Sequence, residues 1–304
     1  HILMIYQADI AWNRIFNKFW VSHEGQTGTG IRLFNIYSPS QVTIRNNTMR
    51  GFYDAGILGD DSLAHADWQT FLLYNEASAC YNGWTLLACN GALVMGNYVE
   101  GSQGGTCFID RSQEVSYIGN FLFEGFSVGY DLSDPGSRGA KISNATIKMG
   151  ANENVVGIKV VNAGHYNWTA SITDSFFETQ AGTNGVKGID ISGSSAAVNI
   201  SGNEFNPRTA WTGTGAFKIR DTTTGAGLIG LVMYDDPAFT AYQGINCGQL
   251  SFTRGALTQA DVASSVLTIG PKNFLEMTAA APVTVNRIVR SVSSDTTQVT
   301  IRLA

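Results

Sequence analysis

The chain has 304 residues, of which 44% are apolar and 14% are charged, and its formal net charge is −5. An acidic chain offers no basic face to nucleic acid or to an anionic membrane, and it contains no run of the roughly 18 apolar residues that a membrane-spanning helix needs. The 34 glycines and the scarcity of charged helix formers predict little helix, while the apolar fraction is large enough for a sizeable core.

The first six residues, HILMIY, already have the composition of a strand. They include neither an initiator methionine at position 1 nor the basic segment that opens a signal peptide. We therefore expect a fragment or a processed product, preceded in the whole protein by earlier coils or an N-terminal cap.

From residue 10 onward the chain repeats one short pattern, in which an apolar residue precedes an Asn by three positions and a second apolar residue follows the Asn by two. The clearest copies are MGNYVEG at 95–101 and IGNFLFEG at 118–125, whose Asn97 and Asn120 lie 23 residues apart. Six of the eight copies keep the Asn: Ile10/Asn13/Ile15, Ile44/Asn47/Met49, Leu72/Asn75/Ala77, Val94/Asn97/Val99, Tyr117/Asn120/Leu122, Ile142/Ala145/Ile147, Ile172/Ser175/Phe177 and Ile200/Asn203/Phe205.

A second mark, a glycine followed by an alternating apolar segment, recurs at the same pace. It occurs at Gly30, Gly56, Gly83, Gly129, Gly157, Gly188 and Gly244, with Gly105 and Gly215 as looser copies. Self-similarity at a period of twenty to thirty residues is typical of repeat architectures.

The apolar residues in each unit alternate with a period of two and are rich in Ile, Val and Phe, which indicates short strands instead of helices. An Asn at a fixed place suits a left-handed residue in a tight turn, and Asn amides stacked at ~4.8 Å can bond to one another as a ladder. The sequence therefore predicts an all-β fold, a right-handed parallel β-helix of about 8–9 coils.

Two parts of the chain depart from the regular repeat. Residues 60–68 form a polar excursion, a place where function is commonly found. From residue 256 the Asn pattern is lost, and strands are expected at 266–269, 274–277, 283–285 and 299–303. We predict two domains, a β-helix over 1–255 that binds and cleaves glycan and a C-terminal β module over 256–304 that caps the coil or promotes trimerisation.

The four cysteines, at positions 80, 89, 107 and 247, have no spacing typical of a metal site or a disulfide framework. We expect buried free thiols, and the alternative is a disulfide between neighbouring coils. No cofactor and no metal ion are predicted.

Aligning the coils on the glycine mark places three carboxylates at the end of the same strand in different coils. These are Asp61, Asp110 and Asp134, with Ala88 between the first two. Carboxylates on adjacent coils would lie ~5 Å apart and those two coils apart ~10 Å, which brackets the separations that glycoside hydrolases use. The alternative is that these residues only close turns.

A second acidic pair, Glu100 and Glu124, follows the Asn turn in two successive coils and is a competing catalytic pair. The alternative is that both glutamates lie in solvent-exposed turns and have no catalytic role. Asp60 can replace its neighbour Asp61 in the first pair.

Basic and aromatic residues near these acids are candidates for substrate binding. Arg111 and Arg138 can hold an anionic sugar or pair with carboxylates, and His65 can be a general base or simply solvated. Five aromatic residues can offer flat faces to sugar rings, or pack at the coil corners: Trp68, Tyr81, Tyr166, Trp168 and Trp211.

The Asn-turn coils MGNYVEG and IGNFLFEG, together with LTIGPKNFLEMTAAAPVTVNRI at 267–288, resemble pectate-lyase-like β-helix proteins, and among them phage tailspikes and tail-borne polysaccharide depolymerases. The resemblance implies an extracellular homotrimer on a virion tail. It also implies binding and endolytic cleavage of a bacterial capsule or lipopolysaccharide chain, by paired Asp or Glu residues.

We therefore expect a polysaccharide depolymerase, with hydrolysis by a carboxylate pair favoured over a lyase reaction. The alternative is a glycan-binding or structural spike without catalysis, in which the acids only cap turns. Neither nucleic acid binding nor membrane insertion is expected.

Overall fold

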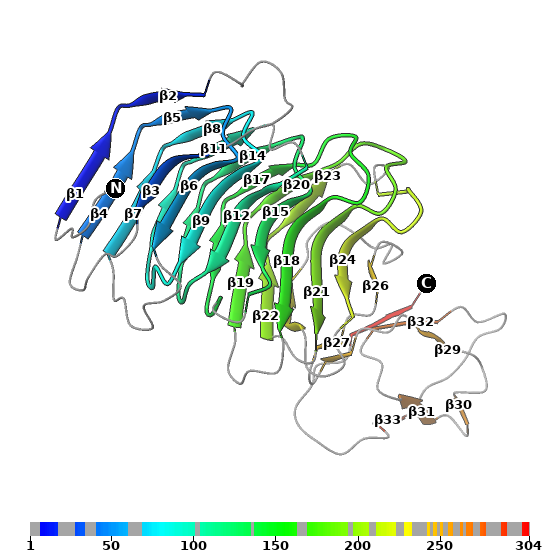
Figure 1. Cartoon of the computed structure of the whole chain (residues 1–304). Helices are drawn as coiled ribbons and strands as arrows, with labels where there is room; N and C mark the ends of the chain where they lie inside the picture. Colours follow the sequence, from blue (N-terminus) through cyan, green and yellow to red (C-terminus); the bar gives the residue numbers. More distant parts are fainter. Residues whose placement is uncertain are drawn as a thin grey trace.

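The computed structural model describes 7–17, 28–33, 41–59, 69–100, 104–134, 137–162, 169–193, 197–206, 211–222, 228–232 and the short strands that follow to residue 303. These residues form an all-β structure in which three long parallel sheets run along one axis (Figure 1). Each turn of the chain contributes one strand to each sheet, so the prediction of a right-handed parallel β-helix is confirmed. Eight turns are complete, and β25 and β26 belong to a ninth.

We call the sheets A, B and C. Sheet A contains β1 (Gln7–Ala11), β4 (Gln41–Arg45), β7 (Gln69–Leu73), β10 (Leu93–Met95), β13 (Ser116–Ile118), β16 (Lys141–Ser143), β19 (Thr169–Thr173), β22 (Ala197–Ser201) and β25 (Leu228–Val232). Sheet B contains β2 (Arg14–Phe16), β5 (Thr48–Arg50), β8 (Glu76–Ser78), β11 (Tyr98–Glu100), β14 (Phe121–Phe123), β17 (Thr146–Lys148), β20 (Phe176–Glu178) and β23 (Glu204–Asn206). Sheet C contains β3 (Thr29–Leu33), β6 (Asp54–Gly59), β9 (Asn82–Leu87), β12 (Thr106–Arg111), β15 (Val128–Leu132), β18 (Val156–Asn162), β21 (Lys187–Gly193), β24 (Phe217–Asp221) and β26 (Tyr242–Gln243).

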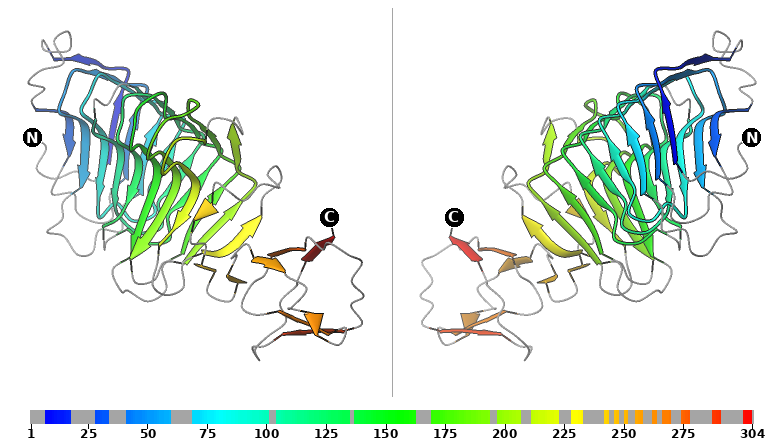
Figure 2. Two further views of the ribbon diagram at one scale, coloured as in Figure 1. Left: turned by 90° about the vertical axis from the view of Figure 1, so that its right-hand side faces the viewer. Right: turned by 90° about the vertical axis from the view of Figure 1, so that its left-hand side faces the viewer.

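The views along the stack in Figure 2 show the strands of successive coils lying one behind another. We number the coils from the sheet A strand, so that coil 1 contains β1, β2 and β3. Each coil has an A–B corner at its Asn, a B–C corner, and a C–A corner that leads into the next coil.

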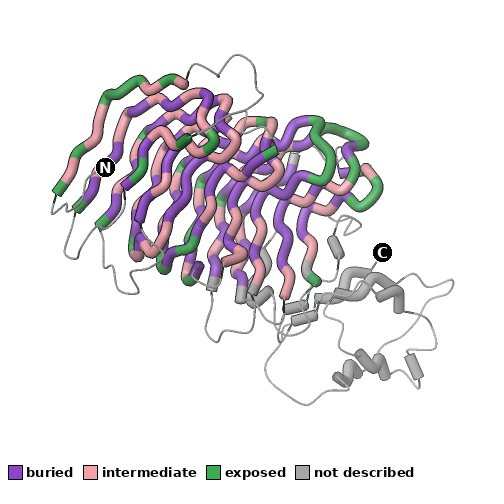
Figure 3. The backbone as a smooth tube through the Cα atoms, in the orientation of Figure 1, coloured by how far each residue is buried: buried purple, intermediate pink, exposed green. Residues whose placement is uncertain are grey.

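The core lies inside the coil, where alternate residues of each strand are buried (Figure 3). Both apolar positions of the repeat face inward and stack in register from coil to coil. For example, Ile10 pairs with Ile44 on sheet A, and Ile15 pairs with Met49 on sheet B. The predicted core positions are therefore confirmed, because a strand period of two places every second side chain on the same face.

At the A–B corner, the left-handed residue is the one before the Asn and not the Asn itself. Positive φ angles occur at Trp12, Asn46, Tyr74, Gly96, Gly119, Asn144, Asp174 and Gly202. The prediction of a left-handed Asn was therefore wrong by one position. The Asn that follows the turn points into the coil, where it satisfies backbone groups that the turn leaves unpaired.

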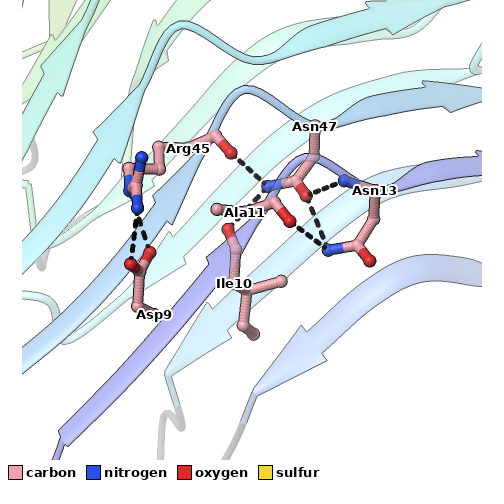
Figure 4. Close-up of polar contacts among 6 residues, drawn as sticks. All are labelled: Asp9, Ile10, Ala11, Asn13, Arg45 and Asn47. Carbon is pink, nitrogen blue, oxygen red and sulfur yellow. Dashed lines mark hydrogen bonds and ion pairs between the residues drawn. The ribbon is translucent and has the colours of Figure 1, made fainter.

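The predicted amide ladder is confirmed over coils 1–5. In Figure 4, Asn13 Nδ2 donates to Asn47 Oδ1 at 2.9 Å, and Asn47 Nδ2 donates to the carbonyls of Ile10 and Arg45. The same Nδ2–Oδ1 bond joins Asn47 to Asn75 (3.0 Å), and further bonds of this kind continue the ladder to Asn97 and Asn120. In coil 6 the place of the Asn is taken by Ala145, which has no amide, so the ladder ends there.

Two three-stranded sheets and a short hairpin follow the β-helix. They are formed by β27 (Asn246–Cys247), β28 (Leu250–Ser251), β29 (Gly255–Leu257), β30 (Val262–Ala263), β31 (Val266–Ile269), β32 (Phe274–Met277), β33 (Arg287–Arg290) and β34 (Thr300–Leu303). The strands predicted at 266–269, 274–277 and 299–303 are present, whereas 283–285 lies outside the described residues.

Cys80, Cys89 and Cys107 are buried free thiols, as predicted. None of the described segments forms a helix with the length and hydropathy that a bilayer crossing requires.

Candidate functional site

The predicted file of aspartates does not form, because the coils align differently from the glycine spacing. Phe108 pairs with both Trp84 and Tyr130, so Cys107, not Gly105, lies opposite Gly83 and Gly129. This shift moves Asp110 two residues along its strand, into line with Leu86 and Leu132. The pairing of Asp110 with Asp134 as a catalytic couple was therefore wrong.

Asp110 faces the interior and is 0% exposed. Its Oδ1 accepts a hydrogen bond from the backbone N–H of Ser112 at 2.8 Å, and its Oδ2 has no hydrogen-bond partner among the described residues. Burial raises the pKa of this carboxyl to about 7. A polysaccharide outside the coil cannot reach it.

Asp134 lies past the end of β15, at the C–A corner, and is partly exposed. Arg111 Nε lies 3.2 Å from Asp134 Oδ2, so these two predicted site residues are ion partners. The backbone of Arg138, on the adjoining segment, donates to Ser112 O at 3.0 Å. The structure thus brings Arg111, Asp134 and Arg138 to adjoining corner segments, where Arg111 pairs with Asp134 and the backbone of Arg138 bonds to that of Ser112.

Glu100 and Glu124 do not occupy equivalent positions. Glu100 pairs with Phe123 across sheet B, and Glu124 follows that Phe at the B–C corner, where its φ is 34°. The IGNFLFEG copy has one more residue than MGNYVEG between the Asn and the Glu, and this insertion causes the offset. As a pair they were predicted wrongly, but Glu100 itself remains on an outer strand face.

Five predicted site residues lie outside the described residues. They are Asp61, His65, Trp68, Tyr166 and Trp168, and Asp60 lies outside as well.

A different pair of carboxylates occurs on the outer face of sheet B, at Glu76 and Glu100. Tyr98 pairs with Glu76, and Glu100 pairs with Ser78, so the two glutamates are diagonal neighbours on adjacent coils. One coil step of ~4.8 Å and two residues of ~3.3 Å along the strand place their Cα atoms roughly 8 Å apart. We call Arg50, Glu76, Tyr98, Glu100 and Phe121 the carboxylate face.

Each carboxylate of this face has a different partner. Arg50 Nη2 lies 2.6 Å from Glu76 Oε1, while the Tyr98 hydroxyl donates to Glu100 Oε2 at 3.0 Å. Burial, followed by the adjacent Glu100 carboxylate, raises the pKa of Tyr98 to about 12, so this phenol remains a neutral donor at any physiological pH. One glutamate is therefore ion-paired and the other is held by a neutral group.

Aromatic rings continue this face into the next coil. The rings of Tyr98 and Phe121 stack with their centroids 5.5 Å apart, and Phe123 stacks with Phe121 at 6.2 Å. Lys148 Nζ lies 5.9 Å from the centroid of Phe121. Outward aromatic rings beside paired carboxylates are the combination that a sugar-binding surface needs.

The adjoining B–C corner has a second aromatic pair. The rings of Tyr53 and Tyr81 stack with their centroids 4.9 Å apart. The register places Gly28 next to Tyr53 and Gly105 next to Tyr81, and because glycine has no side chain, neither position covers the outer face of a ring. Asp54 follows at the start of β6 and accepts a bond from Asn82 Nδ2 at 3.0 Å. Partial burial raises the pKa of Asp54, opposed by that bond and by Arg32.

Tyr81 is one of the aromatic residues predicted to face a sugar, whereas Glu76, Tyr98, Tyr53 and Asp54 were missed from the sequence. A signal for the corner existed, since FYDAG at 52–56 and CYNGW at 80–84 repeat a Tyr followed by Asp or Asn and a small residue. No such signal marked Glu76, because a diagonal relation between adjacent coils depends on the exact register.

No group of three or more His, Cys, Asp or Glu side chains suited to a metal ion occurs among the described residues. Comparisons of the chain with protein-family models, with curated proteins and with solved structures found no match.

Proposed function

We propose that this β-helix binds an extended bacterial surface polysaccharide and hydrolyses it within the chain. The observation that carries the proposal is the diagonal Glu76–Glu100 pair on the open face of sheet B. The register places the two Cα atoms roughly 8 Å apart, which allows the carboxyl groups to take the 6.5–9.5 Å separation of inverting glycoside hydrolases.

The partners of the two glutamates suggest their roles. Glu76, ion-paired with Arg50, is suited to remove a proton from the water that attacks the anomeric carbon. Glu100, whose partner is the neutral phenol of Tyr98, is suited to donate a proton to the glycosidic oxygen as the C–O bond breaks. The water oxygen is added to one sugar and the proton to the other, with inversion at the anomeric centre.

The aromatic rings supply binding surface for the sugars on both sides of the scissile bond. Phe121 lies next to Tyr98 on the following coil, and the Tyr53–Tyr81 stack lies around the corner. Stacking of sugars on such rings needs no charge on the glycan, which suits an acidic protein.

The proposal extends to the setting of the protein. A homotrimer outside the cell, carried on a virion tail, is what the resemblance to tailspikes and depolymerases implies, and it is part of the proposal on that basis alone.

The test is release of reducing ends from a panel of purified capsular polysaccharides and O-antigens. Glu76→Gln and Glu100→Gln should each lower the rate by about 10²–10⁴-fold, because each removes one proton transfer. Glu178→Gln, on the same sheet face three coils beyond Glu100, is the matched control and should leave the rate unchanged. Equal activity of all four proteins on a cleaved polysaccharide would overturn the assignment.

A second candidate function is glycan binding without cleavage. The Tyr53–Tyr81 stack with Asp54 and Asn82 favours it, since these groups can hold a sugar without any catalytic pair. In that case Tyr53→Ala would abolish retention on immobilised polysaccharide while no reducing ends appear with the unmodified protein.

A further inference from the structure

We propose that Asp110 is a pH-sensitive switch of the coil stack. Its neutral carboxyl favours the closed C–A corners of coils 3–5, and its ionisation favours opening of those corners. This inference is independent of the proposed function, because Asp110 lies inside the coil and away from the carboxylate face.

The position of Asp110 is one that other coils fill with an aliphatic side chain. The inward file of sheet C contains Leu33, Leu58, Leu86, Asp110, Leu132, Val160 and Ile191. Every one of these residues is at most 7% exposed. A carboxyl at this position loses its hydration and does not make the apolar contacts that an aliphatic side chain makes there.

The polar groups around Asp110 do not compensate a negative charge. The Ser112 N–H binds Oδ1, but Oδ2 and the Tyr117 hydroxyl, both fully buried, have no hydrogen-bond partner in the part of the chain that the structure describes. Tyr117 and Ser137 are near enough to favour the charged form, yet their effect on the pKa is smaller than that of burial. A single N–H bond leaves half of the carboxylate unsolvated, so ionisation of the buried group is costly.

The titratable groups that face Asp110 carry no positive charge inward. Cys89 comes from the corner below, Tyr117 from β13 and Asp134 from the corner above, and Tyr130 packs against Tyr117. The next residue, Arg111, faces outward with a 43% exposed side chain and is the ion partner of Asp134.

The carboxyl is also placed where three corners are bonded together. Ser112, whose N–H binds Asp110, accepts a bond from Cys89 N through its Oγ at 2.8 Å and one from Arg138 N through its carbonyl at 3.0 Å. An ionised Asp110 carboxylate is stabilised by contact with water, which the closed corners prevent. Ionisation therefore weakens the contacts between neighbouring corners, and opening of the corner lets water solvate the charge.

The direction of the pH effect follows from linkage. In the closed coil the pKa of Asp110 is about 7, whereas in an opened or unfolded chain it is that of an ordinary Asp, 3.8. At pH values between these two pKa values, the closed state therefore binds one more proton than the opened state. The free energy that favours the closed state falls as pH rises from about 4 to about 7 and is constant above that. The opening constant rises by about tenfold per pH unit in this window.

The experiment is amide hydrogen exchange of peptides covering 86–92, 110–117 and 132–140 in the full chain, between pH 4.5 and 8. Wild type is compared at each pH with Asp110→Asn, which keeps the acceptor for Ser112 N–H but cannot ionise, so that intrinsic exchange rates cancel. We expect the ratio of opening constants to rise by on the order of 10²-fold from pH 5 to pH 7.

Asp131→Asn is the matched control. Asp131 also accepts a bond from the N–H two residues on, at 3.1 Å, but it faces outward with Lys159 Nζ 3.8 Å away. Its pH profile should match wild type. Identical profiles for wild type and Asp110→Asn would overturn the proposal, and Asp110→Leu, which restores the aliphatic file, should likewise remove the pH dependence.

Discussion

At the scale of single residues, the Asn ladder explains why one amide recurs through most of the chain. Asn97, for example, donates to the carbonyls of Leu72 and Met95 and accepts from both nitrogens of Asn75. Each amide closes the turn of its own coil and ties it to the two coils beside it. The residue is selected by the backbone groups that the turn leaves unpaired.

We predict that Asn97→Ala lowers the free energy of unfolding by about 3 kcal/mol, because the buried N–H groups of Asn75 and the two carbonyls lose their partners at once. Urea denaturation followed by circular dichroism measures this. Asn199→Ala, on the outer face of sheet A, should change stability by less than about 0.5 kcal/mol. A small effect at Asn97 would show that water replaces the ladder.

At the scale of strands and sheets, the two faces of each strand have separate tasks. Inward residues fill the coil, and the large ring of Trp84 has a glycine opposite it in the preceding coil. Gly56 lies opposite Trp84, and a Cβ at Gly56 would come within 2.2 Å of Trp84 Cζ3. Outward residues are free of this constraint, which is why sheet B can present Glu76, Tyr98 and Glu100 on successive coils.

Gly56→Ala should destabilise the fold by about 2 kcal/mol, since the added methyl displaces the Trp84 ring in a well-packed interior. Combining it with Trp84→Leu, which leaves room for that methyl, should cost less than the sum of the two single changes. A double-mutant cycle by thermal or urea unfolding checks this, and strict additivity would show that the two positions are not in contact.

The carboxylate face also predicts stereochemistry. Because Glu76 and Glu100 lie on diagonal and not directly opposite positions, the proposed mechanism places a water molecule between their carboxyl groups, and the first product should have the inverted anomeric configuration. Proton NMR of freshly released reducing ends distinguishes the two outcomes. Retention of configuration would require carboxyl groups roughly 5 Å apart and would exclude this pair.

At the scale of the whole molecule, the coil stack forms a long surface on which a polymer can lie across several coils. The surface from the Tyr53–Tyr81 stack to Phe121 covers coils 2–5, three steps of ~4.8 Å. Binding should therefore strengthen with glycan length until these coils are covered.

Tyr53→Ala should weaken binding of a long glycan more than binding of a short fragment that contacts only the carboxylate face. Affinity measured by calorimetry on a ladder of oligosaccharides from the cleaved polymer tests this. The same loss at every length would place Tyr53 inside the minimal site, and no loss at any length would remove it from the surface.

Much of this architecture could be predicted from the sequence alone. The period of about two dozen residues, the alternation of apolar positions and the recurring Asn determined the parallel β-helix, the inward residues of sheets A and B and the amide ladder, because all of these depend on local patterns that repeat. Buried free thiols at Cys80, Cys89 and Cys107 followed from their spacing and apolar surroundings.

Which residues form the candidate site was decided only by the tertiary structure. The register between these coils is continuous in sheets B and C, but one inserted residue moves Glu124 past the end of β14, and a Cys at position 107 stands where the glycine mark was expected. In a strand, a one-residue shift turns a side chain from one face to the other. That shift separates Glu100 from Glu124, and the two-residue realignment of Asp110 places it in the buried core. Which carboxylates meet on the surface therefore depends on the hydrogen-bonded pairing between coils, and sequence periodicity specifies that pairing only to within a residue or two.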